Sequence, residues 1–154
     1  MVDANLLDAR GLTKLRAGRK IVDGVNLQVN RGEIVALLGR NKSRKTTTLR
    51  MITGDLKPDD GVVRVQGTVF TDYAQTEGFT GPAILILDEP FSSLDPLKHE
   101  ELKSRILRLA GRGLGVLFAE HDVRGSLDFC DRAYVMADGR IATSGSASGL
   151  VAPQ

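Results

Sequence analysis

Three short runs of uninterrupted apolar residues limit the fold of this chain more than any other feature of its sequence. They lie at Ile34–Leu38, Ala83–Leu87 and Val116–Ala119. Strands that are apolar throughout are typical of a parallel sheet covered on both faces, whereas a half-exposed strand alternates apolar and polar residues. Helical patterns separate the runs, as crossover connections between parallel strands require. The sequence therefore predicts an α/β fold with a mainly parallel sheet.

Local signals predict the helices and the remaining strands. One helix is expected from about Lys45 to Ile52, and a second from Pro96 to Gly111 with Asp95 as its N-cap. A third is expected from Val123 to Cys130. Residues 21–29 end in an apolar–polar alternation, so the strand-rich first third predicts an antiparallel β layer beside the parallel sheet. Further strands are expected at residues 62–65, 69–70, 133–136 and 140–142.

Two segments are less regular than the rest. Residues 67–82 contain glycine, proline and only scattered apolar residues, and the chain from Ser144 onward is rich in serine, glycine and alanine. We therefore expect one core domain over residues 1–147, shortened between 67 and 82, followed by a loosely held tail over residues 148–154.

The bulk properties exclude several classes of protein. The chain has 154 residues, of which 42% are apolar and 26% charged, as in an ordinary globular domain. Its net charge of +2 is too small to imply a nucleic-acid partner. The only cysteine, Cys130, lies among apolar residues, so we interpret it as a buried hydrophobe rather than a reactive thiol. The first ten residues show no secretory signal, and no apolar run approaches the ~20 residues of a membrane span. We therefore expect a cytoplasmic protein.

Polar side chains with catalytic potential follow two of the buried strands. Asp88 and Glu89 end one strand, and His121 follows the next. Ligands bind at the carboxyl ends of strands in an open α/β sheet. There an aspartate can hold Mg²⁺, a glutamate can polarise water and a histidine can contact a phosphate oxygen. Each residue alone would also suit a polar turn or a structural role, but their order favours function. His99 lies on the charged face of a predicted helix and receives no role.

Basic residues are concentrated near the amino terminus. Residues 1–60 contain 12 Lys or Arg against 7 Asp or Glu. Such an excess can attract phosphate, or it can form a solvated basic face, and composition alone leaves both interpretations open.

The order of these pieces resembles that of the ATP-binding-cassette (ABC) ATPases. The resemblance rests on residues 32–39, 45–48, 86–91 and 121–134. Within the family it is greatest to the ATP-binding subunits of lipopolysaccharide export. It implies a P-loop core, ATP and Mg²⁺ as cofactors, transmembrane transporter subunits as partners, a possible homodimer, and a location at the inner membrane through those partners.

The resemblance also assigns roles to individual residues. Lys45 would bind the β- and γ-phosphates. Thr46 would ligate Mg²⁺, and Asp88 would hold it through water. Glu89 would be the catalytic base and His121 would sense the γ-phosphate. The residues expected to contact the nucleotide are Gly39, Asn41, Lys45, Thr46, Thr47 and Arg16.

The phosphate loop departs from the family pattern G-x-x-x-x-G-K-[ST]. Arg44 stands where the pattern has its second glycine, and Lys42 where the family has another inner glycine. The loop must turn backbone N–H groups toward phosphate, and a residue with a side chain forced into a left-handed conformation there costs roughly 1–2 kcal/mol. The charges of Lys42 and Arg44 could instead retain some phosphate affinity.

A larger departure lies between Thr46 and Asp88. The family places a helical subdomain with an L-S-G-G-Q signature there, and this sequence contains neither. Gln75 is interpreted as a remnant of the glutamine loop and as a third metal ligand. The aromatic residue that stacks on adenine is missing, and Arg16, whose guanidinium can stack on a ring, stands near its place.

The sequence therefore predicts the ATP-binding subunit of an ABC transporter of the lipopolysaccharide-export kind, with impaired hydrolysis. The alternative is a non-hydrolysing remnant or an engineered mini-domain that at most binds nucleotide or phosphate. A DNA-repair or chromosome ATPase of related fold is disfavoured because it too would need the signature.

Overall fold

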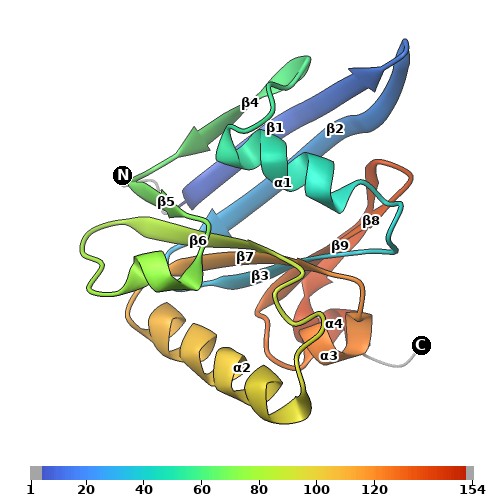
Figure 1. Ribbon diagram of the computed structural model, residues 1–154. Helices are drawn as coiled ribbons and strands as arrows, with labels where there is room; N and C mark the ends of the chain where they lie inside the picture. Colours follow the sequence, from blue (N-terminus) through green and yellow to red (C-terminus); the bar gives the residue numbers. More distant parts are fainter. Residues whose placement is uncertain (1–4, 152–154) are drawn as a thin grey trace.

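A computed structural model describes residues 5–151, and these residues form two β-sheets with helices between and below them (Figure 1). The first sheet has three antiparallel strands in the order β2-β1-β4, and the second has six in the order β5-β6-β7-β3-β8-β9. The strands of the first sheet are β1 (Asn5–Arg16), β2 (Arg19–Asn30) and β4 (Asp60–Val65). Those of the second are β3 (Ile34–Leu38), β5 (Thr68–Phe70), β6 (Ala83–Asp88), β7 (Gly115–Glu120), β8 (Arg132–Ala137) and β9 (Arg140–Ser146).

The helices divide between the two faces of the larger sheet. Helix α1 (Lys45–Thr53) lies between the two sheets, whereas α2 (Pro96–Gly111), α3 (Val123–Leu127) and α4 (Ala147–Val151) lie on the opposite side (Figure 1). The predicted α/β class with an antiparallel β layer is confirmed, because β5, β6, β7, β3 and β8 pair in parallel and only β9 runs antiparallel.

The central strand β3 explains why the apolar runs are continuous. All five of its residues are buried. Val35 and Leu37 pack into the core under the antiparallel sheet and α1, and Ala36 and Leu38 pack into the core against α2 and α3. Successive side chains point to opposite faces of a strand, so a strand with a core on each side must be apolar throughout.

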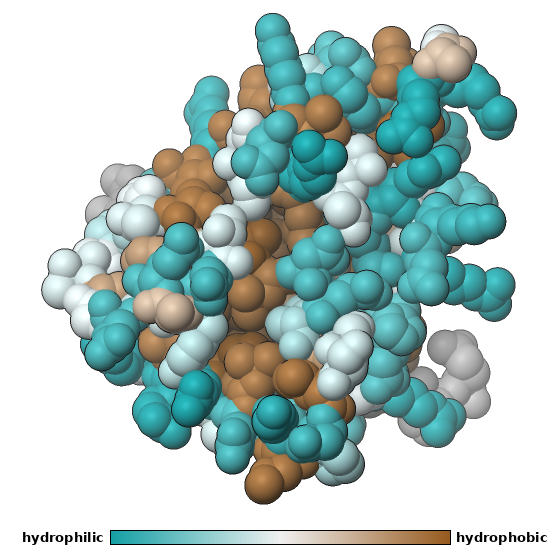
Figure 2. All heavy atoms as spheres, viewed as in Figure 1, coloured by the Kyte–Doolittle hydropathy of each residue, from teal (hydrophilic) through white to brown (hydrophobic). Residues whose placement is uncertain are grey.

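The molecular surface combines hydrophilic and hydrophobic regions. In the view of Figure 2, hydrophilic side chains cover much of the surface, and a band of hydrophobic ones runs down its middle. None of the helices within residues 5–151 is long and apolar enough to cross a membrane.

Two sequence expectations need correction, and one strand was missed. Strand β1 was not separately predicted, although it pairs with both β2 and β4 and forms the middle of the antiparallel sheet. Helix α3 ends at Leu127 instead of Cys130, because the chain turns there and buries Phe129 and Cys130 against the core. The segment from Ser144 is not loose as far as it is described: β9 runs to Ser146, and α4 follows with Ala147 buried and its N–H donating to the carbonyl oxygen of Asp131 at 3.0 Å. Residues 152–154 of the predicted tail lie outside the described part.

The shortened segment has the predicted irregular form. Between α1 and β6, the structure contains only β4, β5 and a short 3₁₀ turn, η1 (Tyr73–Thr76), with no α-helix among these described residues. The ends of the segment meet, because the N–H of Thr68 donates to the carbonyl oxygen of Pro82 at 3.1 Å.

Candidate functional site

The loop between β3 and α1 begins at a position that only glycine fits. A Cβ at Gly39 would lie 2.5 Å from the carbonyl oxygen of Met136 and 2.7 Å from Oγ of Ser43. The loop ends at Arg44, which precedes α1 with φ 81° and ψ 27°, the left-handed conformation that glycine adopts at little cost. Lys42 has a negative φ, so its replacement of a family glycine strains no backbone. The loop thus keeps a glycine-like turn although an arginine occupies it.

Lys45 is buried at the start of α1 and points into this loop. Its Nζ donates to the carbonyl oxygens of Gly39 at 2.5 Å and Arg40 at 3.1 Å. Burial lowers the pKa of Lys45, and the negative charges of Glu89, Asp88 and Glu120 oppose that shift. The ammonium is therefore held at the base of the loop, beside the carboxylates that end β6 and β7.

Two of the three residues predicted to hold Mg²⁺ are in contact. Oγ1 of Thr46 donates to Oδ2 of Asp88 at 2.7 Å. Neighbouring ligands of an octahedral Mg²⁺, bound at about 2.0–2.1 Å, lie about 2.9 Å apart, so this pair of oxygens has the chemistry and the spacing of two adjacent ligands. The residues present fit the ion that the family uses.

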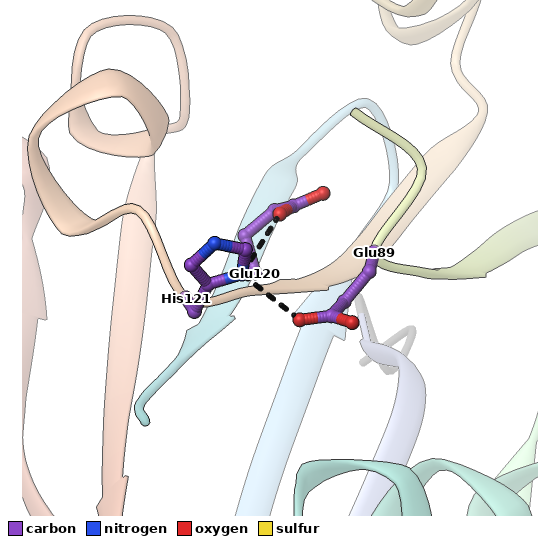
Figure 3. A group of neighbouring side chains, drawn as sticks. All are labelled: Glu89, Glu120 and His121. Atoms are coloured by element: carbon purple, nitrogen blue, oxygen red, sulfur yellow. Dashed lines mark hydrogen bonds and ion pairs between the residues drawn. The ribbon is translucent and has the colours of Figure 1, made fainter. Parts of the chain in front are cut away.

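Glu89 and His121, the predicted catalytic pair, also meet. Strands β6 and β7 are parallel neighbours with Asp88 opposite Ala119, so the residues that follow both strands lie side by side. Nδ1 of His121 lies 3.0 Å from Oε1 of Glu89 (Figure 3). Glu89 has a φ of 49°, an uncommon conformation for a residue with a side chain and one that is often found at functional sites.

Glu120 belongs to the same cluster, although the sequence analysis gave it no role. Its side chain is only 4% exposed. Burial raises its pKa, although its Oε2 accepts a hydrogen bond from the N–H of Phe91 at 2.9 Å. The available signal was a charged residue at the end of an otherwise apolar strand, directly before His121.

A pocket of about 340 Å³ is lined by the loop, the start of α1 and Glu89. This volume lies within the roughly 300–1,000 Å³ of small-molecule sites, so the pocket can accept phosphate groups. Among the residues expected to contact the nucleotide, Asn41, Lys45, Thr46 and Thr47 line it, and Glu89 lines it as well. Its lining residues are Asn41, Lys42, Arg44, Lys45, Thr46, Thr47 and Glu89.

A second pocket, of about 410 Å³, shares Lys42 and Arg44 with the first. Arg16 lines it, at the β1–β2 turn, together with Arg19 and Lys20. The residue expected near the adenine is therefore next to the phosphate loop, in strongly basic surroundings. The full lining is Arg16, Ala17, Arg19, Lys20, Ile21, Lys42, Arg44 and Asp138.

Gln75 is not brought to this site. Its Oε1 accepts hydrogen bonds from the N–H groups of Thr71 and Asp72 and so closes the start of η1. In Figure 1, η1 and the loop between β3 and α1 lie on opposite sides of the molecule. The structure therefore separates Gln75 from the other two predicted metal ligands.

Comparison with known proteins agrees with this geometry. Residues 22–79 match the ABC transporter family. The chain is 28% identical to an uncharacterised ABC transporter ATP-binding protein of Rhizobium meliloti, over 94% of this chain and 82% of that protein. It is 27% identical to the lipopolysaccharide export system ATP-binding protein LptB of Haemophilus influenzae, over 92% of this chain and 91% of that protein.

Solved structures show the same fold. The ATP-binding subunit of an ABC transporter superposes with a TM-score of 0.82 at 20% identity, covering 94% of this chain and 91% of that one. An ATP-binding cassette in its ADP conformation gives a TM-score of 0.81. By sequence over most of its length and by fold, the chain is similar to the ATP-binding proteins of ABC transporters.

The length of the alignment also reveals a difference from these relatives. The alignment with the Rhizobium meliloti protein runs over 221 residues, whereas this chain has 154 in all. A long stretch of the relative therefore has no counterpart in this chain. The segment between α1 and β6, where the ends close at Thr68 and Pro82, is the place in the fold where such a stretch fits.

Proposed function

We propose that this chain binds the phosphates of ATP with Mg²⁺ at the pocket between the phosphate loop and Glu89, and that a single chain does not turn ATP over. The observation that carries the proposal is that one pocket contains Lys45, Thr46 and Glu89, with Asp88 bonded to Thr46 and His121 bonded to Glu89. Those are the residue types and the order that the family uses for ATP.

Each residue contributes a different chemical property. Lys45 supplies a positive charge at the loop, and the start of α1 supplies backbone N–H groups. Thr46 and Asp88 offer oxygen ligands to Mg²⁺, which when bound neutralises charge on the phosphates. Glu89 can accept a proton from water, and His121, 3.0 Å away, holds its carboxylate in place.

The shortened segment limits what the bound nucleotide can do. Phosphoryl transfer depends on positioning and on charge stabilisation. A charged side chain that a partner protein adds to such a site increases the rate by roughly 10³–10⁵-fold. The family carries its signature in the region that this chain lacks. Two chains could still associate, but they would not bring that signature to each other's nucleotide.

We infer further that the protein serves a cytoplasmic ABC transport system, attached to the membrane through transmembrane subunits. Support comes from the likeness to LptB at 27% identity over most of both proteins. Lipopolysaccharide export is the system that this likeness favours.

Calorimetric titration of Mg-ATP into the full chain tests the binding proposal. The parent should bind, more weakly at higher salt because Lys42 and Arg44 are exposed and their charges are screened. Lys45→Met keeps the buried aliphatic stem and removes the charge, so it should abolish binding. Lys57→Ala removes a lysine outside the pocket and should bind as the parent does. Equal binding by Lys45→Met and the parent would refute the proposed site.

A further inference from the structure

Three side chains that can bind metal converge where β6 and β7 end. They are Glu89, Glu120 and His121, and one ligand atom of each lies within 4.8 Å of the other two (Figure 3). Nδ1 of His121 lies 3.0 Å from Oε1 of Glu89 and 3.9 Å from Oε1 of Glu120. The imidazole nitrogen thus faces two carboxylate oxygens from neighbouring strand ends.

Glu120, the buried member of this cluster, is held in its orientation without a bound ion. Glu120 is 4% exposed, and the N–H of Phe91 holds its Oε2 at 2.9 Å. That bond leaves Oε1 directed toward His121. The backbone of Glu89 is fixed as well, because its N–H donates to the carbonyl oxygen of Ala119 at 2.8 Å. His121 is 53% exposed, so an ion can reach the group from solvent.

We propose that Glu89, Glu120 and His121 form a binding site for a divalent transition-metal ion of the zinc class. Zinc binds histidine nitrogen at about 2.0–2.1 Å and carboxylate oxygen at about 2.0–2.2 Å, usually tetrahedrally, which places its ligands about 3.3–3.5 Å apart. The separations of 3.0 and 3.9 Å fall on either side of that value. Small side-chain rotations would therefore bring the three donors around one ion, with water as a fourth ligand.

This site differs from the Mg²⁺ position at Thr46 and Asp88. One imidazole nitrogen with two carboxylates suits zinc and its first-row neighbours, whereas a hydroxyl with a carboxylate suits magnesium. The transition-metal site needs no nucleotide, so its test is independent of the test of the proposed function. A bound ion would engage both Glu89 and His121 and prevent Glu89 from accepting a proton.

Cobalt titration of the full chain without nucleotide tests the proposal. The chain carries no affinity tag in this experiment, because His99 and His121 are its only histidines. One equivalent of Co²⁺ should bind with the strong visible absorption of a four-coordinate site. Zn²⁺ should remove that absorption, and a large excess of Mg²⁺ should leave it unchanged. The absence of saturable Co²⁺ binding, or displacement by Mg²⁺, would overturn the proposal.

Matched variants test which residues bind the ion. His121→Ala should weaken Co²⁺ binding at least roughly tenfold, since even loss of an outer-shell partner costs roughly 10–100-fold. Glu120→Gln should have a similar effect, with circular dichroism confirming the fold. His99→Phe removes the other imidazole, keeps a ring against Phe91 and should bind as the parent does. Unchanged binding by His121→Ala, an exposed position whose variant should fold, contradicts the site.

Discussion

At the scale of single residues, the site combines backbone strain with family-like side-chain positions. Arg44 and Glu89 both have positive φ, at 81° and 49°, and both line the phosphate pocket. A residue with a side chain keeps such a conformation only where its surroundings impose it. At Arg44 the surroundings are those of a loop that family members build with glycine. The arginine has therefore replaced the glycine without changing the turn.

This strain predicts the effect of restoring the glycine. Arg44→Gly should raise the free energy of unfolding by about 1 kcal/mol, part of the roughly 1–2 kcal/mol that a left-handed conformation costs. Arg44→Ala removes the charge but keeps a Cβ, so it should gain little. Lys42→Gly should not stabilise the protein, because Lys42 has a negative φ. Denaturant unfolding of the three variants measures these differences, and equal gains from Arg44→Gly and Arg44→Ala would assign the effect to charge.

At the scale of elements, the shortened segment is closed by a tight contact between its two ends. A Cβ at Gly67, which has φ 82°, would come within 1.9 Å of the carbonyl oxygen of Pro82. The adjacent Thr68 bonds to the same oxygen, and β5 then pairs with β6. The edge strand of the larger sheet therefore depends on a glycine at this junction.

Gly67→Ala should accordingly destabilise the protein by more than the roughly 1–2 kcal/mol of a left-handed alanine. The excess comes from the backbone clash with Pro82, which must push β5 away from β6. Gly78→Ala is the matched control, because Gly78 has φ 69° but nothing within 4 Å of its would-be Cβ. Denaturant unfolding gives both losses, and limited proteolysis of residues 68–82 reports the loosened strand. Equal losses would show that the clash relaxes without cost.

A second contact between elements joins the two sheets. Arg132, at the start of β8, donates from Nε to Glu33 at 2.7 Å and from one terminal nitrogen to the carbonyl oxygen of Gln28 in β2 at 2.8 Å. Burial alone would raise the pKa of Glu33, but the hydrogen bonds from Arg132 and from the N–H of Asn30 bring it below its usual value. The charged pair thus connects β2, β3 and β8.

The lowered pKa fixes the sign of the pH dependence. Glu33 stabilises the fold above the pKa of glutamate in the unfolded chain, about 4.3, and this stabilisation is lost as the pH falls through the lower folded value. Glu33→Gln should cost about 2 kcal/mol at neutral pH, and the difference from the parent should shrink toward pH 3. Unfolding free energies across this range test it, with the exposed Glu100→Gln as control. A deficit that stays constant with pH would mean that packing, not charge, is lost.

At the scale of the whole molecule, the sequence predicted the parallel sheet and indicated candidate site residues that the structure brings together, because both depend on local signals. Continuous apolar runs identify doubly covered strands, and Asp88, Glu89 and His121 follow those runs directly. Strand β1 and the position of Gln75 could not be predicted, because they depend on pairing between distant segments and on how the shortened segment closes. The role of Glu120 depends on its contact with Phe91, across two strand ends.

The arrangement of the whole chain predicts that Mg-ATP binds without being hydrolysed. The site holds Lys45, Thr46, Asp88, Glu89 and His121 together, but the described residues between α1 and β6 contain no helical segment that could reach a second nucleotide. A missing set of transition-state contacts removes rate without removing the ground-state contacts that bind ATP. We therefore expect Mg-ATP binding with no steady phosphate release above background.

A coupled phosphate-release assay on the calorimetry sample measures this. Glu89→Gln serves as the control, because it removes the proposed base while keeping the size of the side chain. Phosphate release that is the same in the parent and in Glu89→Gln comes from contaminating enzymes and agrees with the prediction. Steady release by the parent that Glu89→Gln abolishes would show instead that this chain hydrolyses ATP without the signature segment of the ABC ATPases.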